Sequence, residues 1–351
     1  MKAYSIAVLG GDGIGPEVVG AGLDVLRATE SALESVRFDL HEYSVGAGEY
    51  LRNGDPLPAE ALKNMRGCDA ILLGAMGLPD VRRPNGVEMT PQIDIREELD
   101  LFCGVRPIRL YHASHTPLKN FSAGEIDFVI VRENCEGLFS ERLTPRPPGR
   151  DFETDTMTIT HRGAQRICRA AFELAAKRRR HVTLVDKANV LPSMAFFRRV
   201  FDEVAGEFPA IATERVYVDA MALFLVQRPQ SFDVIVTENM FGDILSDLAA
   251  GIVGGMGMAP SADLGDRYGV FQPSHGTAPA LKGKNAANPA ATILSVAMML
   301  DWLEHPEAKR GARMIESAVQ SVFADPANRT QDLGGQLRTA ELTQLVIANL
   351  R

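Results

Sequence analysis

The stretch FDVIVTENMFGDILSDLAA, Phe232–Ala250, passes from a short β-branched segment into a helical pattern. The run Val234–Thr237 predicts a buried strand, and the segment Asp243–Ala250 predicts a helix. Asp243 and Asp247 are four residues apart, so on a helix their carboxylates lie on one face, about one turn apart. A strand that leads into a helix is the repeating unit of an α/β fold.

The same alternation continues on both sides of this stretch. Further strands are predicted at Ser5–Leu9, Ala70–Leu73, Phe128–Arg132, Val182–Asp186 and Val216–Val218. Further helices are predicted at Glu17–Ser35, Thr90–Phe102, Arg162–Lys177, Met194–Glu207, Met221–Gln227, Ala287–Leu303 and Ala308–Ala324. This order indicates an α/β protein with a largely parallel sheet. Because no linker divides the chain, we expect domains built from discontinuous segments.

Composition excludes several classes of function. The chain has 351 residues, 46% of them hydrophobic, and a formal net charge of −8. A mildly acidic protein lacks the basic surface that binds nucleic acids and anionic membranes. The basic run Lys177–His181 is typical of a solvated helix end. The four cysteines have neither zinc-site nor disulfide spacing. The first residues, MKAYSIAVLGG, are not typical of a signal peptide. Together with the scattered cysteines, they predict a cytoplasmic protein.

The aspartate pair is the first candidate site. Two like charges at this helical spacing destabilise each other, and a divalent cation would compensate them. Ligands that are all oxygen atoms favour Mg²⁺ or Mn²⁺. Asp219, which ends the β-like run Arg215–Asp219, is a candidate third ligand. The alternative is a first helical turn in which Asp243 faces the helix dipole and Asp247 is solvated.

Other motifs leave two interpretations open. GGDGIGPE, Gly10–Glu17, follows the first strand and is either an anion cradle or a structural elbow between a strand and a helix. HGTAP, His275–Pro279, is either a nucleotide cradle or an ordinary connection. Arg96, Arg106 and Arg132 would specify a dicarboxylate if they point inward, but arginines also end strands as solvated residues. Lys187 is a surface residue or, if desolvated, a general acid/base.

Taken together and in this order, the motifs resemble the β-decarboxylating dehydrogenases of isopropylmalate, isocitrate, homoisocitrate, tartrate and D-malate, with isopropylmalate dehydrogenase-like members the most similar in appearance. The matching blocks are GDGIGPE (Gly11–Glu17), LLGAMG (Leu72–Gly77), REELDLFCGVRP (Arg96–Pro107), VREN (Val131–Asn134), VDKANVL (Val185–Leu191), VYVDAMA (Val216–Ala222), Phe232–Ala250 and HGTAPALKGKNAANPAA (His275–Ala291). The resemblance implies a two-domain α/β fold of the isocitrate/isopropylmalate dehydrogenase type, with a central mixed, largely parallel sheet. It also implies a nucleotide-binding domain of residues 1–100 plus 256–351, and a substrate, metal and dimerisation domain of residues 101–255.

The resemblance also implies a role for each matching residue. Asp243 and Asp247 match metal ligands of one subunit of a homodimer, and Asp219 matches the ligand from the other subunit. Lys187 matches the lysine that reaches across the interface to the substrate hydroxyl. The positions that match substrate contacts are Arg96, Arg106, Arg132, Thr90, Gln92 and Asn189. The positions that match the cofactor site are Ile14, His275, Gly276, Thr277, Ala278, Asn288 and Asp332.

Phe139 departs from the family pattern. Relatives have a tyrosine seven residues after the third clamp arginine, where it acts as the acid in decarboxylation, whereas RENCEGLFSER places Phe139 there. Phenylalanine cannot donate a proton. Three explanations compete: water or another side chain protonates the enol, the enzyme oxidises with little decarboxylation, or the chain is a non-catalytic regulatory subunit. The last is disfavoured because all three aspartates, all three arginines and Lys187 are present.

Two further segments bear on specificity. Ala280 and Leu281 match neither the aspartate of NAD-preferring relatives nor the lysine and tyrosine of NADP-preferring ones, while DLGG, Asp332–Gly335, favours NAD. In the turn before Arg96, Thr90 and Gln92 suit a polar substituent, and Met89 and Ile93 keep an apolar component.

The expected activity is oxidation of a 3-substituted malate by NAD or NADP with Mg²⁺ or Mn²⁺, followed by β-decarboxylation, with an isopropylmalate-like substrate first. Tartrate or D-malate, and then isocitrate, are the alternatives. From the aspartates alone, a metal-dependent phosphatase is the rival enzyme class. The expected partners are the hydroxy-dicarboxylate and a second copy of the chain, with neither nucleic acid nor membrane.

Overall fold

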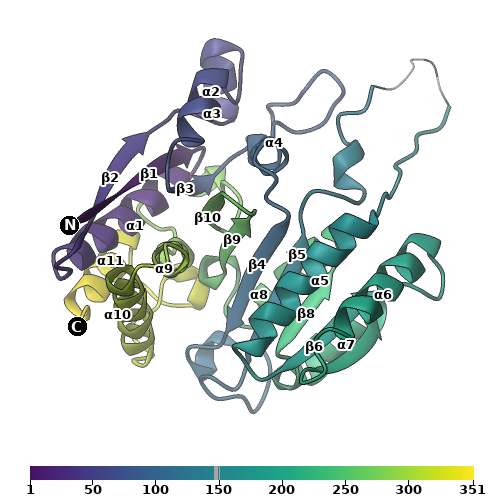
Figure 1. The fold of residues 1–351 in the computed structure, drawn as a ribbon. Helices are drawn as coiled ribbons and strands as arrows, with labels where there is room; N and C mark the ends of the chain where they lie inside the picture. Colours follow the sequence, from purple (N-terminus) through teal and green to yellow (C-terminus); the bar gives the residue numbers. More distant parts are fainter. Residues whose placement is uncertain (146–148, 150) are drawn as a thin grey trace. The chain divides into compact units, whose positions relative to one another are not determined.

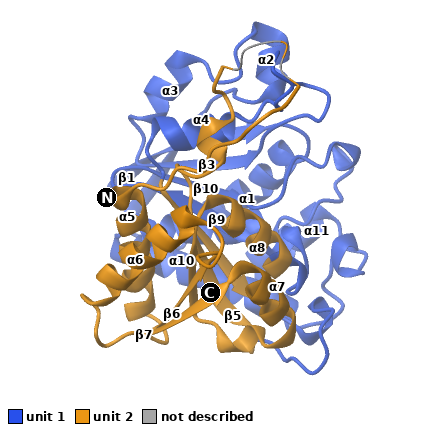
Figure 2. Ribbon diagram, turned by 90° about the vertical axis from the view of Figure 1, so that its right-hand side faces the viewer, with its two compact units in different colours: residues 1–101, 110–124, 250–351 blue, residues 102–109, 125–249 orange. Residues whose placement is uncertain are grey.

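The computed structural model describes residues 1–145, 149 and 151–351. They form two compact units (Figure 2). Unit 1 comprises Met1–Leu101, Leu110–Gly124 and Ala250–Arg351, and unit 2 comprises Phe102–Arg109 and Glu125–Ala249. The predicted boundaries assign Leu110–Gly124 to the second domain, whereas this segment packs with unit 1.

Unit 1 contains a five-stranded mixed sheet and its covering helices. Its strands are β1 (Lys2–Gly11), β2 (Val36–Glu42), β3 (Ala70–Ala75), β9 (Pro260–Leu264) and β10 (Gly269–Pro273). Its α-helices are α1 (Gly15–Glu30), α2 (Ala47–Asn53), α3 (Ala59–Met65), α4 (Pro91–Glu98), α9 (Ala290–Trp302), α10 (Pro306–Phe323) and α11 (Thr339–Ala348), with short 3-10 turns at Ala113–His115, Met256–Met258, Pro279–Leu281 and Gln331–Leu333. Figure 1 shows α1, α9, α10 and α11 gathered on one side of these strands.

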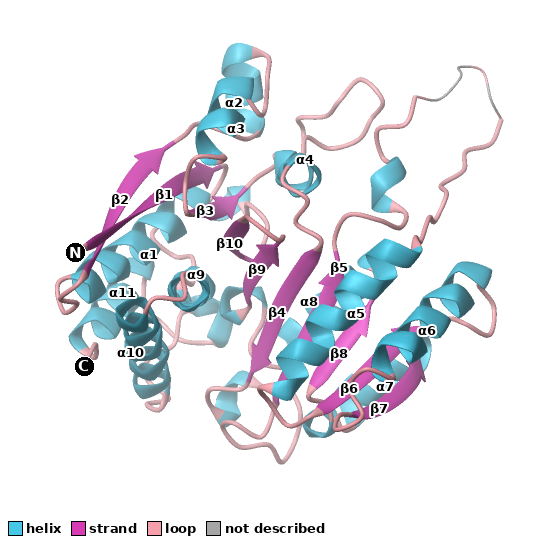
Figure 3. Cartoon of the chain, in the orientation of Figure 1, coloured by secondary structure: helices cyan, strands magenta, loops and turns pink. Residues whose placement is uncertain are grey.

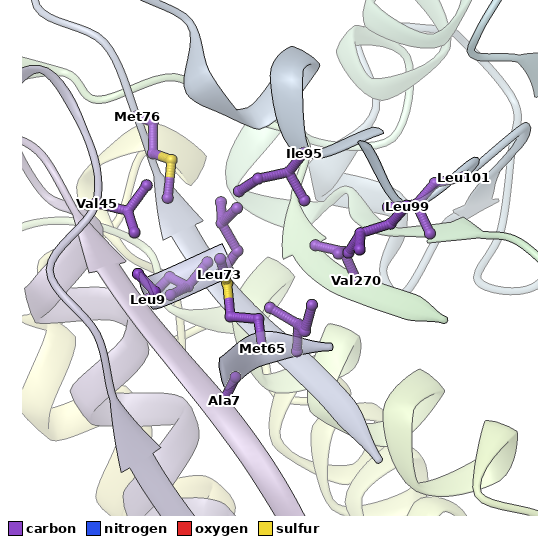
Figure 4. Packing of buried hydrophobic residues seen from close by; sticks show 12 residues of the cluster. Ala7, Leu9, Val45, Met65, Leu73, Met76, Ile95, Leu99, Leu101 and Val270 are labelled. Carbon is purple, nitrogen blue, oxygen red and sulfur yellow. The ribbon is translucent and has the colours of Figure 1, made fainter. Parts of the chain in front are cut away.

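The strand order in unit 1 is β2-β1-β3-β10-β9. Every pairing is parallel except that of β9 with β10. All six residues of β3 are buried, as expected for a parallel strand that is covered on both faces. On one face, β1, β3 and β10 contribute to a cluster of buried side chains that includes Leu9, Leu73 and Val270 (Figure 4). Ile95, Leu99 and Leu101 close the same cluster and so fix the position of α4.

Unit 2 contains five further strands of mixed direction. Its strands are β4 (Cys103–Arg109), β5 (Asp127–Glu133), β6 (His181–Asp186), β7 (Ala212–Tyr217) and β8 (Val234–Thr237). Its helices are α5 (His161–Ala176), α6 (Pro192–Ala205), α7 (Val218–Gln227) and α8 (Asn239–Gly251), with short 3-10 turns at Phe139–Glu141 and Pro229–Ser231. The last two residues of α8 belong to unit 1.

The strand order in unit 2 is β4-β5-β8-β6-β7, and only the pairing of β4 with β5 is antiparallel. Helix α5 packs against β5, β8 and β6, and next to α6. The basic run after α5 has a structural role, since Arg178 bridges Asp127 and buried Asp233 at 2.6 and 2.8 Å. These ion pairs hold the amino-terminal ends of β5 and β8 together.

The predicted α/β class with a mixed, largely parallel sheet is confirmed, and Figure 3 shows the alternation of strands and helices. The helix predicted at Glu17–Ser35 ends early, at Glu30, and two further local predictions, which bear on the candidate site, are wrong. The β-like run Arg215–Asp219 ends as a strand at Tyr217, so Asp219 lies in the first turn of α7. The helix predicted at Thr90–Phe102 ends at Glu98, because Cys103 already begins β4. Among the described residues, no helix is long and apolar enough to cross a membrane.

Candidate active site

The predicted site residues of unit 2 follow the carboxyl ends of its parallel strands. Arg132 is near the end of β5, Lys187 directly follows β6, and Asp219 lies two residues after β7. Asn239 begins α8 two residues after β8. Because the carboxyl ends of parallel strands meet at one edge of a sheet, this edge is where an α/β protein binds its ligands. The topology of unit 2 therefore gathers these residues at one edge.

Helix α8 places Asp243 and Asp247 on one face, as predicted. The helix begins at Asn239 and its first turn contains no acidic residue. The alternative in which Asp243 faces the helix dipole is therefore wrong. Instead, Glu238 accepts hydrogen bonds from the N–H groups of Met240 and Phe241 at 3.0 and 2.6 Å, which satisfies two of the free donors at the start of the helix.

The guanidinium of Arg132 is buried and held from two sides. Its Nε and Nη2 donate to Oδ1 of Asn239 at 3.1 and 2.7 Å, and its Nη1 pairs with Asp243. Gly242 permits this approach, since a Cβ there would lie 2.6 Å from Cγ of Arg132. The interpretation of Arg132 as a solvated strand end is therefore wrong. Sequence reasoning missed Asn239, although an amide that follows a strand beside the FGD motif was an available signal.

The two carboxylates on α8 repel each other. Partial desolvation of Asp247 by neighbouring atoms raises the pKa of its carboxyl, the charge of Asp243 raises it further, and the charges of Arg106 and Arg132 oppose both effects. Arg106 is 5% exposed and lies on β4, opposite Ile130 of β5. A cation at α8 would relieve the repulsion, so the donor set fits a divalent metal ion.

Lys187 and Asp219 form an ion pair with each other within one chain. The pair lies at the surface, with the Asp219 side chain 68% exposed, and the hydrogen bond from Lys187 lowers the pKa of the Asp219 carboxyl. Asn189 is exposed in the turn that follows Lys187. In the described part of one chain, no three His, Cys, Asp or Glu residues gather as a metal site. A single chain therefore does not bring Asp219 to the aspartates of α8.

Phe139 begins the 3-10 turn Phe139–Glu141 and is half-buried. Its ring lies under the guanidinium of Arg132. The residue at the departure from the family pattern thus contacts the same arginine that Asn239 and Asp243 hold.

In unit 1, Arg96 occupies the last turn of α4 and is buried. Its Nε donates to Oδ2 of Asp263, on β9, at 2.8 Å, and Gln272, on β10, donates to the same oxygen. Sequence reasoning missed both partners. Thr90 precedes α4 without capping it through its side chain. Gln92 lies in the first turn, and its buried Oε1 accepts no hydrogen bond from the described residues.

A pocket of about 480 Å³ in unit 1 contains four of the predicted cofactor positions. Ile14, His275, Asn288 and Asp332 line it, together with the glycine-rich segment Gly254–Gly257. Gly276, Thr277 and Ala278 do not line it but form the loop that carries His275. Ala278 adopts a left-handed conformation, with φ of +36°, and such strain in a non-glycine residue is typical of functional loops.

The polar groups in this pocket are partly preorganised. Asn288 donates from Nδ2 to Oδ2 of Asp332 at 3.1 Å. The Nδ1 of His275 pairs with the carbonyl of Gly276 at 2.9 Å, while its Nε2 is buried without a hydrogen-bond partner among the described residues. Burial lowers the pKa of His275, which favours the neutral form of the ring. A nucleotide base offers the hydrogen bond that Nε2 lacks, so the pocket fits a nucleotide cofactor.

The GGDGIGPE elbow supports the His275–Ala278 loop. The N–H of Ile14 donates to the carbonyl of Thr277 at 2.8 Å, and a Cβ on Gly13 would lie 2.0 Å from that oxygen. The carboxylate of Asp12 accepts hydrogen bonds from the N–H groups of Ala47, Gly48 and Gly77 at 2.7 to 3.0 Å. These contacts favour the structural interpretation of the motif over an anion cradle.

Comparison with known proteins gives one consistent result. The family model described as isocitrate/isopropylmalate dehydrogenase matches residues 5–346. A 3-isopropylmalate dehydrogenase of Aquifex aeolicus is 41% identical over 100% of this chain and 98% of its own. One of Corynebacterium efficiens is 45% identical over 90% and 91% of the two chains. A 3-isopropylmalate/3-methylmalate dehydrogenase of Methanocaldococcus jannaschii is 40% identical over 99% of both.

Solved structures show the same fold. An isocitrate dehydrogenase from Methylococcus capsulatus has a TM-score of 0.88 and 35% identity, over 99% of each chain. A β-decarboxylating dehydrogenase from Thermococcus kodakarensis, in its apo form, has a TM-score of 0.82 and 36% identity, over 99% of this chain and 96% of that one.

Proposed function

The chain belongs to the isocitrate/isopropylmalate dehydrogenase family, and from this membership we propose that it oxidises a 3-substituted malate of the 3-isopropylmalate type with NAD. The family membership makes the chain an enzyme, a β-decarboxylating dehydrogenase that acts on a CH–OH group. The proposal adds the substrate, the cofactor, the metal and the assembly. The observation that carries it is the cluster of Arg132, Asp243, Asp247 and Arg106 beside the strand ends of unit 2.

The arginines bind the substrate carboxylates in this proposal. Arg132 is preorganised by Asn239, so its orientation does not have to be fixed when substrate binds. Arg106 and Arg96 supply the other guanidinium groups, and both are buried. Buried arginines favour a dianionic substrate because a carboxylate that replaces water there forms charge-assisted hydrogen bonds.

The substituent on C3 is read by the turn before Arg96. Met89 is buried there and Ile93 is half-buried, which suits an alkyl group. The buried Oε1 of Gln92 offers an acceptor to a polar substituent. That single observation supports tartrate, whose C3 hydroxyl can donate to Oε1, as the second candidate substrate; D-malate, which has no C3 substituent, and then isocitrate are the other candidates.

Asp243 and Asp247 would hold Mg²⁺ or Mn²⁺, with Asp219 of a second subunit as the third ligand. The ion, when bound, supplies Lewis acidity that favours loss of the hydroxyl proton and of CO₂. The side chains perform the remaining tasks. Lys187, or a water molecule that it polarises, would accept the hydroxyl proton, and Arg132 would hold a substrate carboxylate in a fixed orientation.

The cofactor is proposed to be NAD rather than NADP. The carboxylate of Asp332 lies on the wall of the unit 1 pocket and is fixed by Asn288 and Thr330. A fixed negative charge there accepts hydrogen bonds from a base or ribose but repels an additional phosphate. Ala280 and Leu281 supply no positive charge to offset that repulsion.

The active form is proposed to be a homodimer. Large apolar side chains are exposed on α7 and α8, with Leu223 at 52%, Val226 at 45% and Ile244 at 59% exposure. They lie on the same two helices as Asp219 and the α8 aspartates. A second copy that covers this surface would bury them and would bring the Lys187–Asp219 pair to the neighbouring site.

A substrate screen tests the proposal. The purified protein is given 3-isopropylmalate, 3-methylmalate, tartrate, D-malate and isocitrate, each with NAD or NADP and with Mn²⁺. Nicotinamide reduction and CO₂ release are followed together. The expected result is the highest kcat/KM with an alkyl-substituted malate and NAD. Preference for tartrate or isocitrate would transfer the assignment to that class, and reduction of neither cofactor would favour a regulatory subunit.

A further inference from the structure

A buried carboxylate that the proposed reaction does not use lies beside one of the proposed substrate arginines. Asp263 is 0% exposed, and its Oδ2 accepts hydrogen bonds from Nε of Arg96, at 2.8 Å, and from Nε2 of Gln272. The side chain of Arg96 in this pair is 9% exposed. The two residues are 167 positions apart in the sequence, and both belong to unit 1.

The antiparallel pairing of β9 and β10 creates this arrangement. Asp263 is opposite Val270, and Gln272 is two residues further along β10. Side chains two residues apart on a strand project from the same face, so the Gln272 amide reaches Asp263 diagonally across the pair. Gly265 then lets the chain pass close to the end of α4, since a Cβ there would lie 2.6 Å from the carbonyl of Asp100.

Because the Arg96–Asp263 pair is buried, each charge needs hydrogen-bond partners within the protein. A buried carboxylate is costly unless it is paired and hydrogen-bonded, and removal of one partner strands the other charge. At Oδ2, Asp263 has one charged donor, Arg96, and one neutral donor, Gln272. The backbone of Arg96 is fixed as well, because its carbonyl accepts from the N–H of Leu101 at 2.9 Å. Arg96 is therefore restrained at its backbone by Leu101 and at its guanidinium by Asp263.

The pairing opposes simple electrostatic attraction of substrate. A negative charge beside Arg96 weakens the local field that draws in a dianion. A site designed only for attraction would leave this position neutral. Asp263 instead restricts how the planar fork of Arg96 is oriented, and the geometry of that fork determines bidentate recognition of a carboxylate.

We propose that Asp263, supported by Gln272, is a positioning residue that orients Arg96 to receive a substrate carboxylate. The inference rests on the proposed function, in which Arg96 binds substrate. It predicts that loss of Asp263 weakens substrate binding even though the site becomes more positive. Electrostatic attraction alone predicts the opposite direction, so the sign of the effect distinguishes the two.

The experiment compares Asp263→Ala, Asp263→Asn and the wild-type enzyme with 3-isopropylmalate, NAD and Mn²⁺. Asp263→Ala should raise the KM for the dicarboxylate roughly tenfold, with a much smaller change in kcat, because an oriented contact formed in both ground and transition states is lost. Asp263→Asn keeps an oxygen acceptor for Nε and should lie between alanine and wild type. The KM for NAD should stay within about twofold. A dicarboxylate KM at or below the wild-type value in either variant overturns the proposal.

Coupling to Arg96 is tested in a double-mutant cycle. Asp263→Ala introduced into Arg96→Ala should change the dicarboxylate KM by less than about twofold, because a residue that acts through Arg96 has no effect without it. A full tenfold effect in that background would overturn the assignment. Thermal unfolding of each variant identifies any that fails to fold, in which case Asp263→Asn and Gln272→Leu replace Asp263→Ala.

A measurement without turnover separates this inference from the proposed function. Hydrogen exchange at the Arg96 Nε–H, followed by NMR on the intact protein, should be slow in the wild type and at least tenfold faster in Asp263→Asn. Equal exchange rates overturn the positioning role. If the wild type oxidises no malate, the proposed function fails and the role of Asp263 in substrate binding falls with it, while the exchange result still decides whether Asp263 orients Arg96.

Discussion

The guanidinium carbon of Arg132 lies 5.4 Å from the centre of the Phe139 ring. This is a cation–π distance, so Phe139 stabilises a charged arginine that Asn239 and Asp243 also hold. An aromatic ring at this position can therefore have a binding role that does not require a hydroxyl group. The same contact means that a tyrosine introduced at residue 139 would carry its hydroxyl group on a ring that already lies beside Arg132.

Phe139→Tyr should increase the CO₂ released per nicotinamide reduced, because the phenol can donate the proton that phenylalanine cannot. Both products are measured in one assay, with Phe139→Leu as the control that removes the ring. Phe139→Leu should raise the substrate KM by loss of the contact with Arg132. If the ratio is already one in the wild type, another group or water supplies the proton.

Asp247→Asn should raise the metal concentration needed for half-maximal activity by tenfold or more, because a carboxylate ligand is lost. The metal-free variant should be slightly more stable than the metal-free wild type, by about 0.2–0.5 kcal/mol, since a like-charged pair at i,i+4 has been removed. Titration of activity with Mn²⁺ measures the first effect, and thermal unfolding of the metal-free proteins measures the second. Asp24→Asn, on α1, is the control substitution, and an unchanged metal requirement in Asp247→Asn would refute the metal assignment.

Co-expressed Lys187→Ala and Asp247→Asn chains should recover activity that neither variant has alone. If each site takes Lys187 from one subunit and Asp247 from the other, a mixed dimer has one intact site, and random pairing gives about a quarter of wild-type activity. The check is kcat per chain, which should be about a quarter of the wild-type value in the mixture and about half of it in the mixed dimer after separation by differential tags. Activity that stays at the level of the parents would show that both residues serve the same site from one chain.

Gly13→Ala should raise the KM for NAD and lower the melting temperature. Its Cβ would overlap the carbonyl of Thr277, and its φ of +59° is unfavourable for alanine, at about 1–2 kcal/mol. Gly20→Ala is the matched control, because that glycine lies in α1 with no atom within 4 Å of a Cβ. It should be neutral or stabilising by up to about 1 kcal/mol. An unaltered NAD KM in Gly13→Ala would separate the elbow from cofactor binding.

His115 should make the protein sensitive to acid. The ring is 5% exposed, packs edge-on against Phe323 at 5.1 Å, and has no hydrogen-bond partner for either nitrogen among the described residues. Desolvation, with the charges of His112 and Arg329, lowers its pKa to about 4. The unfolded chain, with an ordinary pKa near 6.5, binds more protons between these values. Stability from this group is therefore complete above pH 6.5 and is lost as the pH falls toward 4.

The size of this effect is about 2 kcal/mol of unfolding free energy between pH 8 and pH 5. His115→Leu should remove that part of the pH dependence without loss of a hydrogen bond. Urea unfolding at both pH values measures it. An unchanged difference between the two pH values in the variant would assign the acid sensitivity to other groups.

The sequence was sufficient for features with short-range signals. The spacing of Asp243 and Asp247 is a property of one helix, and the β-branched strands of unit 2 are recognisable by composition. Asp219 was misplaced because Val216–Val218 suits a strand by propensity, while the pairing with β6 stops at Tyr217. Where the ladder ends, the chain turns into α7, and only the register of the neighbouring strand shows that point.

Long-range contacts could not be predicted. The link between Arg96 and Asp263 depends on two strands meeting the end of a helix, and no local pattern encodes it. The placement of Leu110–Gly124 in unit 1 depends on His115 packing against Phe323, which is 208 positions later in the sequence (323 − 115). Asn239 was missed for a similar reason, since its role is defined by Arg132, a side chain on β5.

The nesting of unit 2 within the sequence of unit 1 orders events during synthesis. All of unit 2, residues 102–109 and 125–249, is synthesised before β9 and β10, whereas β3 of unit 1 lacks its neighbour β10 until residue 273 has been made. Chains are made from the amino terminus at roughly 5–20 residues per second, so the first hundred residues wait seconds for the segment that completes their sheet. During that interval the edge of β3, apolar throughout, is the part of the nascent chain most in need of a chaperone.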